Sequence, residues 1–168
     1  FNEFKRADGP TNTVPFLEAS KAMSRGIGYA GEGDVLTAAL VGALARGFGK
    51  TTFTEIFCPD WKGGSLFLSH MGEINPEISE GKPRLIEKPY PFTPALNPAV
   101  ITCAPKAGPG VFVNIVPGPD DEFALIAAPV KILPDTANPA MKEQIRGWMK
   151  PAMEIGRFLE EYSRWGGT

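Results

Sequence analysis

Six segments rich in β-branched and aromatic residues follow one another through the middle of this 168-residue chain, with no helical pattern between them. They cover residues 51–58, 65–71, 84–88, 99–104, 111–116 and 122–133. Turn-forming stretches separate them, and successive strands without crossover helices pair antiparallel. We therefore expect an α+β fold whose sheet closes into a six-stranded, Greek-key-type β-barrel with flanking helices. Pro129 is expected at an edge, an end or a bulge, because proline cannot donate to a sheet ladder.

Helical periodicity precedes these strands. Residues 15–25 place apolar side chains at helical spacing, which predicts a short amphipathic helix. Residues 35–46 are apolar on nearly every side, with Asp34 and Gly47 available as caps. A helix of that composition is expected to be buried.

Helical spacing returns after the strands, in residues 141–149 and 152–165, where Pro151 interrupts it. We interpret residues 1–50 as a helical segment that could end a preceding domain. Residues 51–168 are interpreted as a C-terminal β-barrel domain with terminal helices. The chain starts without Met and stops directly after the last helical pattern, so we expect a fragment whose barrel domain is truncated at its end.

Charge and cysteine content exclude several classes of protein. The 17 Lys and Arg against 19 Asp and Glu supply no basic field for nucleic acid and no polybasic membrane anchor. The charge balance therefore argues against nucleic acid as a partner. Because no run of 18 apolar residues occurs, we also expect no membrane partner. Cys58 and Cys103 form no CxxC pair and no disulfide framework, which favours a protein of the reducing cytoplasm.

The glycines of Gly26-x-Gly28-x-x-Gly31 match the dinucleotide-binding fingerprint and precede a helix. That motif requires a preceding strand, whereas residues 16–25 have a helical pattern, and no parallel βαβ unit follows. Nucleotide binding is therefore disfavoured, and the stretch is interpreted as a tight, shaped loop.

Two acidic residues occupy unusual places. Glu32 lies between two glycines just before a helix, where it could meet a ligand or serve as a simple N-cap. Glu55 interrupts a strand pattern and shares a face with Phe53. A carboxylate buried there needs a partner such as a metal or a reacting proton, whereas a solvent-facing one needs none.

His70 is the only histidine of the chain. A lone imidazole makes no metal site by itself and is more typical of a structural or surface position. Glu73 follows at His-x-x-Glu spacing, which in a strand points two side chains to opposite faces. We therefore interpret Glu73 as a turn residue.

Four motifs, taken in order, resemble the C-terminal half of the L-fucose/L-arabinose isomerase family. They are GYAGEGD at residues 28–34, LTAAL at 36–40, FTE at 53–55 and SHMGE at 69–73. Their approximate spacing also agrees with that family. The similarity runs from about Pro15 to the end, where FLEEYSRWGGT resembles the segment that leads into a His-bearing strand.

The resemblance implies a divalent cation, usually Mn²⁺, held by Glu32, Glu55 and His70, with a last His ligand expected beyond Thr168. It implies aldose–ketose isomerisation by an ene-diol route, in which Glu32 and Glu55 act as the acid and base that move a proton between C1 and C2. Which carboxylate removes the proton stays open. His70 is expected to be neutral, with its other ring nitrogen bonded to a nearby acceptor.

The resemblance also implies a small-molecule sugar substrate and a homo-oligomer. Residues 56–58 are Ile-Phe-Cys, not the Asp-Tyr-Thr-Tyr type of run found in typical arabinose isomerases, which leaves another aldose open as substrate. The alternative function is a non-catalytic carbohydrate-binding or regulatory barrel domain derived from such an isomerase.

Overall fold

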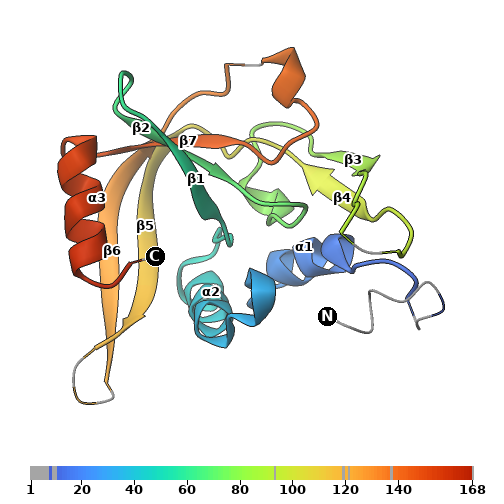
Figure 1. Cartoon of the computed structure of the whole chain (residues 1–168), viewed down its shortest axis with the longest axis horizontal. Helices are drawn as coiled ribbons and strands as arrows, with labels where there is room; N and C mark the ends of the chain where they lie inside the picture. Colours follow the sequence, from blue (N-terminus) through green and yellow to red (C-terminus); the bar gives the residue numbers. More distant parts are fainter. Residues whose placement is uncertain are drawn as a thin grey trace.

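Antiparallel strand pairs dominate the fold of this chain (Figure 1). The computed structural model describes residues 8, 11–92, 94–118, 120, 122–136 and 138–167. One sheet holds five strands, in the spatial order β1 (Glu55–Asp60), β2 (Ser65–Ser69), β7 (Gly147–Pro151), β6 (Phe123–Ile132) and β5 (Gly108–Pro117). A separate two-stranded ladder pairs β3 (Arg84–Glu87) with β4 (Ala99–Thr102).

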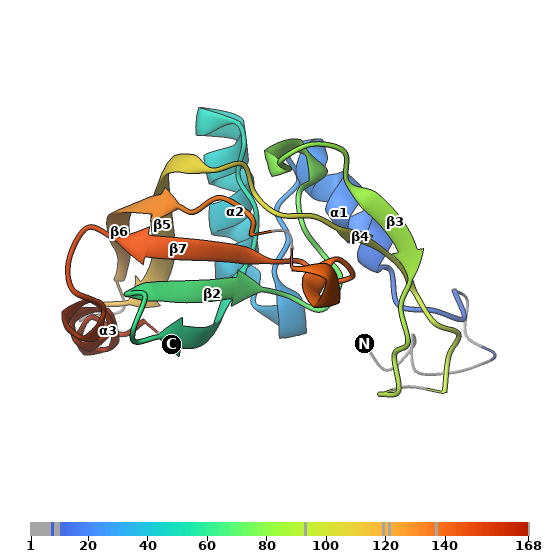
Figure 2. The ribbon, with the colours of Figure 1, turned by 90° about the horizontal axis from the view of Figure 1, so that it is seen from above.

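The expected α+β class with an antiparallel sheet is confirmed, and the expected six-stranded closed barrel is wrong. Within the described residues, β1 and β5 are the two edges of an open sheet. Two of the six expected strands, β3 and β4, pair with each other and lie beside α1 instead of extending the sheet (Figure 2). Val100 of β4 packs with Val14 and Phe16 in a core of their own, which holds this ladder apart.

Pro129 lies where its backbone chemistry allows. It sits opposite Val111 in the β5–β6 ladder, whereas β7 pairs with β6 only from Val130 to Ile132. On the β7 side, Pro129 is therefore just beyond the end of the ladder, and the prediction of an edge or end position is confirmed.

The described residues also form three α-helices, namely α1 (Phe16–Ser24), α2 (Val35–Phe48) and α3 (Ile155–Arg164). The Asp34 side chain accepts a hydrogen bond from the Thr37 backbone N–H and starts α2, as predicted, and Gly49 ends it two residues later than expected. Glu154 caps α3 by accepting from the Gly156 and Arg157 backbone N–H groups. Short 3₁₀ turns occur at η2 (Gly31–Gly33), η3 (Pro76–Ile78) and η5 (Pro139–Met141).

The predicted helix over residues 141–149 is wrong, because residues 142–146 form a turn and irregular chain and strand β7 begins at Gly147. Gly147, Met149 and Pro151 are buried and the residues between them are less so, which is the period of a strand. Strands β2 and β6 lie on either side and supply backbone partners for this segment. Tertiary pairing therefore outweighs a short helical pattern.

The main core lies between the sheet and α3, which covers one face (Figures 1 and 2). It contains Leu66, Leu68, Val130, Met149, Ile155, Phe158 and Tyr162. A second core joins Met23 of α1, Val41 of α2 and Phe53, and so brings the loop before α2 close to the chain that enters β1. Across the described residues, no helix combines the length and apolar character needed to cross a membrane.

Candidate metal centre

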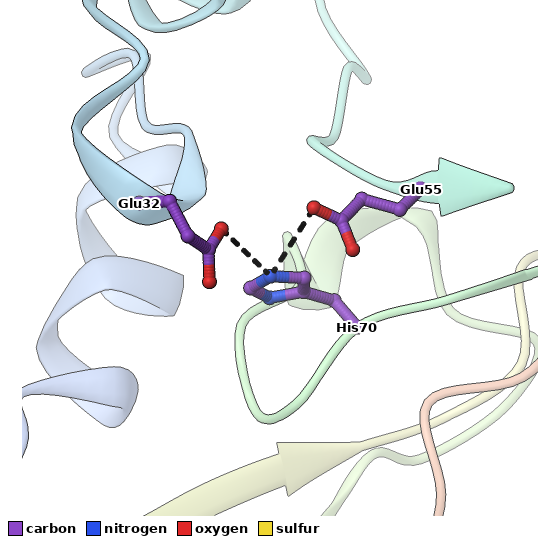
Figure 3. A group of neighbouring side chains, drawn as sticks. All are labelled: Glu32, Glu55 and His70. Carbon is purple, nitrogen blue, oxygen red and sulfur yellow. Dashed lines mark ion pairs between the residues drawn. The ribbon is translucent and has the colours of Figure 1, made fainter. Parts of the chain in front are cut away.

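Glu32, Glu55 and His70 meet at one end of the β1–β2 pair (Figure 3). One ligand atom from each residue lies within 4.8 Å of the others. Nε2 of His70 is 4.0 Å from Oε2 of Glu32 and 3.9 Å from Oε1 of Glu55. The fold therefore brings together all three site residues expected from the sequence.

The strand register explains why Glu55 and His70 are neighbours. Glu55 is the first residue of β1 and pairs with Ser69, the last residue of β2, so His70 follows directly. The strand predicted from residue 51 begins four residues later, which places Glu55 at a strand end and not within a strand. Its side chain is 44% exposed and faces the imidazole from the open side of the site.

Glu32 reaches the site through an unusual backbone conformation. It lies in the left-handed region, with φ 53° and ψ 15°, between Gly31 and Gly33 in turn η2. A non-glycine residue seldom adopts this conformation and tends to do so at functional sites. Asp34, not Glu32, caps α2, so the N-cap alternative for Glu32 is wrong. The Glu32 side chain is 74% exposed, which leaves its carboxylate accessible.

The imidazole of His70 is only 4% exposed and is fixed on several sides. The ring of Phe53 meets it edge-on, with 4.8 Å between the ring centroids. Gly31 lies against its Nε2 side, where a side chain would crowd it. Nδ1 lies 2.7 Å from Oε2 of Glu73. A ring held in this way presents Nε2 to the two site carboxylates.

Glu73 is the site residue that the sequence analysis missed. Its side chain is 1% exposed. It accepts hydrogen bonds from the Tyr29 hydroxyl and the Gly72 backbone N–H, in addition to its contact with His70. The expectation of opposite faces is wrong because β2 ends at Ser69, and the chain bends at Met71 and Gly72. The signal that could have found Glu73 is the glycine just before it, which is typical of a turn that brings positions three apart together.

The carboxylates make this end of the sheet electrostatically negative. Burial lowers the pKa of His70, but the hydrogen bond to Glu73 and the charges of the nearby carboxylates raise it by more, so the pKa lies above its ordinary value. Burial, followed by the charge and hydrogen bond of Glu73, raises the pKa of Tyr29 and keeps its hydroxyl protonated. The contributions of the carboxylates to these two pKa shifts indicate a place where an added positive charge is favourable.

The donor set fits a divalent cation. Two carboxylates and one imidazole nitrogen suit Mn²⁺ and similar ions, whereas a closed zinc site would use thiolates or more imidazoles. Fold and site together define a mixed α+β domain that carries, at one end of its sheet, an acid–imidazole centre able to hold a divalent cation.

The chain belongs to the L-arabinose isomerase C-terminal domain family, whose sequence profile matches residues 50–168. This match confirms the resemblance seen in the sequence. L-arabinose isomerase 2 of Bacillus licheniformis is 35% identical over 107 residues, which covers 61% of this chain and 22% of the relative. The L-arabinose isomerase of Leuconostoc mesenteroides is 36% identical over 118 residues, or 68% of this chain and 25% of the relative. The L-arabinose isomerase of Koribacter versatilis is 31% identical over 128 residues, which covers 73% of this chain and 25% of the relative. The chain thus spans about a quarter of the length of these relatives.

Proposed function

We propose that this chain is the metal-binding part of an aldose–ketose sugar isomerase, with Glu32, Glu55 and His70 as the protein ligands of Mn²⁺ or another divalent cation. The observation that carries the proposal is the convergence of two accessible carboxylates on Nε2 of a buried imidazole. Family membership supplies the reaction class.

The residues divide into an accessible pair and a fixed one. Glu32 and Glu55 are exposed enough to meet a sugar, whereas His70 is buried and held from its Nδ1 side. A divalent cation bound there would supply Lewis acidity toward the carbonyl and hydroxyl oxygens of an open-chain sugar. One carboxylate takes the proton from C2 and a proton is delivered to C1, while the hydroxyl proton of O2 is transferred to O1. This isomerisation is internally balanced and needs no oxidant or reductant.

L-arabinose is the first substrate to test, because the curated relatives are L-arabinose isomerases. The Ile-Phe-Cys run at residues 56–58 keeps other aldoses in the test. We measure conversion of L-arabinose and of other aldoses in the longest natural protein that carries this chain. If none of these sugars is converted, the isomerase proposal is rejected.

The metal ligands are tested by titrating the chain with Mn²⁺ and measuring bound ion by calorimetry and electron paramagnetic resonance. Glu32→Gln and Glu55→Gln each remove one anionic ligand, and we expect affinity to fall at least tenfold in both. Glu77→Gln is the matched control, since Glu77 is exposed and lies outside the cluster. Unchanged Mn²⁺ affinity in both ligand variants would reject the site.

One observation favours the alternative of a non-catalytic carbohydrate-binding domain. A cavity of about 220 Å³ is lined by Phe67 and Trp148 and by the paired side chains of Asp135 and Arg146. Aromatic faces beside charged hydrogen-bonding groups are a common way to bind sugars. None of the three cluster residues lines this cavity. Sugar binding that survives chelation and is lost in Trp148→Ala, with no turnover, would favour this second function.

We also propose that the protein is a cytoplasmic homo-oligomer, with residues 1–50 ending a preceding domain and 51–168 forming the C-terminal one. The free thiols of Cys58 and Cys103 support a reducing compartment. Large exposed apolar side chains support association, among them Val35, Phe48 and Phe123. Light scattering on the purified protein tests the oligomeric state.

A further inference from the structure

We propose that Glu73 is the positioning residue of the centre: it holds His70 in the tautomer that carries hydrogen on Nδ1 and directs the Nε2 lone pair toward Glu32 and Glu55. The part of this inference that concerns a bound cation rests on the proposed function. The orientation of the ring itself does not depend on any ion.

The hydrogen bonds that Glu73 accepts from Tyr29 and Gly72 favour Nδ1 of His70 as the donor of the His70–Glu73 pair. The Gly72 backbone N–H donates to Oε2 over 2.9 Å, so this oxygen acts as an acceptor. Nδ1 of His70 lies 2.7 Å from the same oxygen, and we assign the hydrogen of that pair to Nδ1, since a carboxylate has only acceptors. A neutral imidazole with hydrogen on Nδ1 has its free lone pair on Nε2. Nε2 is the atom that lies 4.0 Å and 3.9 Å from the two site carboxylates.

Burial makes this arrangement costly to change. With a side chain only 1% exposed, Glu73 has no water to replace a lost donor, so its three hydrogen bonds fix one orientation. Lys88 lies close enough for its charge to interact with Glu73, and its Nζ donates to the Met71 carbonyl in the same turn. The turn that carries His70 is therefore anchored from both sides.

Tyr29 extends the role of Glu73 to a second ligand. Its hydroxyl donates to Oε1 of Glu73, and it belongs to the same loop as Glu32, three residues away. The Tyr29 ring also packs edge-on against Phe53, with 5.8 Å between centroids. Through this hydrogen bond, one buried carboxylate sets the distance between the loop that carries Glu32 and the turn that carries His70.

The tautomer can be measured directly, because His70 is the only histidine of the chain. Two-bond ¹H–¹⁵N spectra of the metal-free chain, recorded where the ring is neutral, report which nitrogen carries hydrogen. We expect Nδ1–H in the wild type and in Glu73→Gln, whose amide oxygen can still accept. We expect this preference to be lost in Glu73→Leu. An Nε2–H ring in the wild type would overturn the proposal whatever the metal affinity is.

Metal affinity gives an independent readout. Titration with Mn²⁺ alone is expected to show a 10- to 100-fold loss of affinity in Glu73→Leu. We expect about a tenfold loss in Glu73→Gln, which keeps the hydrogen bond but removes the charge. Tyr29→Phe keeps the ring packing and removes only the hydroxyl, so its Mn²⁺ affinity should fall several-fold. Glu77→Leu, on the exposed side of the same segment, is the control and should bind as the wild type does.

The outcomes separate the two proposals. If Glu73→Leu fails to fold, the tautomer of the wild-type ring decides, and an Nε2–H ring there overturns the positioning role. An Nδ1–H ring in a wild-type chain that binds no Mn²⁺ would refute the metal site and uphold the role of Glu73 in orienting the ring.

Discussion

Gly31 lies directly against the imidazole of His70, and a side chain at position 31 would crowd the ring. A Cβ atom there would lie 3.0 Å from Nε2 and 3.2 Å from Cε1 of the imidazole. The ring of Phe53 closes in from another direction. The position of Nε2, the atom offered to a cation, therefore depends on the absence of a side chain at residue 31.

Gly31→Ala should weaken Mn²⁺ binding about tenfold, because the new methyl group pushes the ring away from its place beside the carboxylates. Calorimetric titration measures the effect. Gly47→Ala serves as the control, since nothing lies within 4 Å of a Cβ there, and it should leave affinity unchanged. Equal affinity in Gly31→Ala and the wild type would show that the ring does not need this space.

Gly28→Ala should destabilise the whole chain. A Cβ at Gly28 would lie 1.9 Å from the Ala38 carbonyl oxygen and 2.7 Å from the Gly42 backbone N, both in α2. Backbone atoms of a helix cannot move aside as a flexible side chain can, so we expect a loss of about 1–3 kcal/mol or more in the free energy of unfolding. Urea denaturation measures it, and a midpoint equal to that of the wild type would contradict the close packing.

Bound metal should stabilise the fold and chelation should remove that stability. At a free Mn²⁺ concentration one hundred times the dissociation constant, mass action adds about 2.7 kcal/mol, which raises Tm by roughly 5–10 °C for a chain of this size. We expect EDTA to reverse the rise. In Glu32→Gln and Glu55→Gln, the same Mn²⁺ concentration should produce a much smaller shift, and a full shift in both would place the ion elsewhere.

The cap of α3 should make stability depend on pH. Hydrogen bonds from the Gly156 and Arg157 backbone N–H groups lower the pKa of Glu154 from its ordinary value of 4.5. A lowered folded-state pKa means that the carboxylate stabilises the fold above pH 4.5, and that this contribution is lost as the pH falls through the folded-state value. Glu154→Gln should therefore lower Tm at pH 7 and have little effect below the folded-state pKa. The difference in Tm between the two proteins, measured from pH 7 to pH 3, should shrink toward acid, and a constant difference would contradict the assignment.

The sequence predicted local elements well wherever capping or helix-ending residues mark their ends. Asp34 marks the start of α2 and is its observed cap, and the pattern over residues 152–165 contains α3. Residues 141–149 carry no such marks, and their apolar spacing suits a helix as well as a strand. Pairing with β2 and β6 decided between the two, and that information lies far away in the chain.

The site was predictable in its ligands but not in their support. The motifs around Glu32, Glu55 and His70 carry the family resemblance, and the fold brings the three side chains together. Glu73 was missed because the period-two rule was extended past the end of β2 at Ser69. The barrel was expected from the number of strands alone, although closure depends on which edges meet, and strand patterns do not encode that.

Glu32, Glu55 and His70 are separated by 23 positions (55 minus 32) and 15 positions (70 minus 55). An ion held by all three would act as a cross-link that closes two loops of the chain at once. The ion stabilises the folded chain because it binds only where these loops are already closed, and the entropy cost of closing them grows only slowly with loop length. The same three side chains would thus join the loop before α2, the start of β1 and the end of β2 into one unit that unfolds cooperatively.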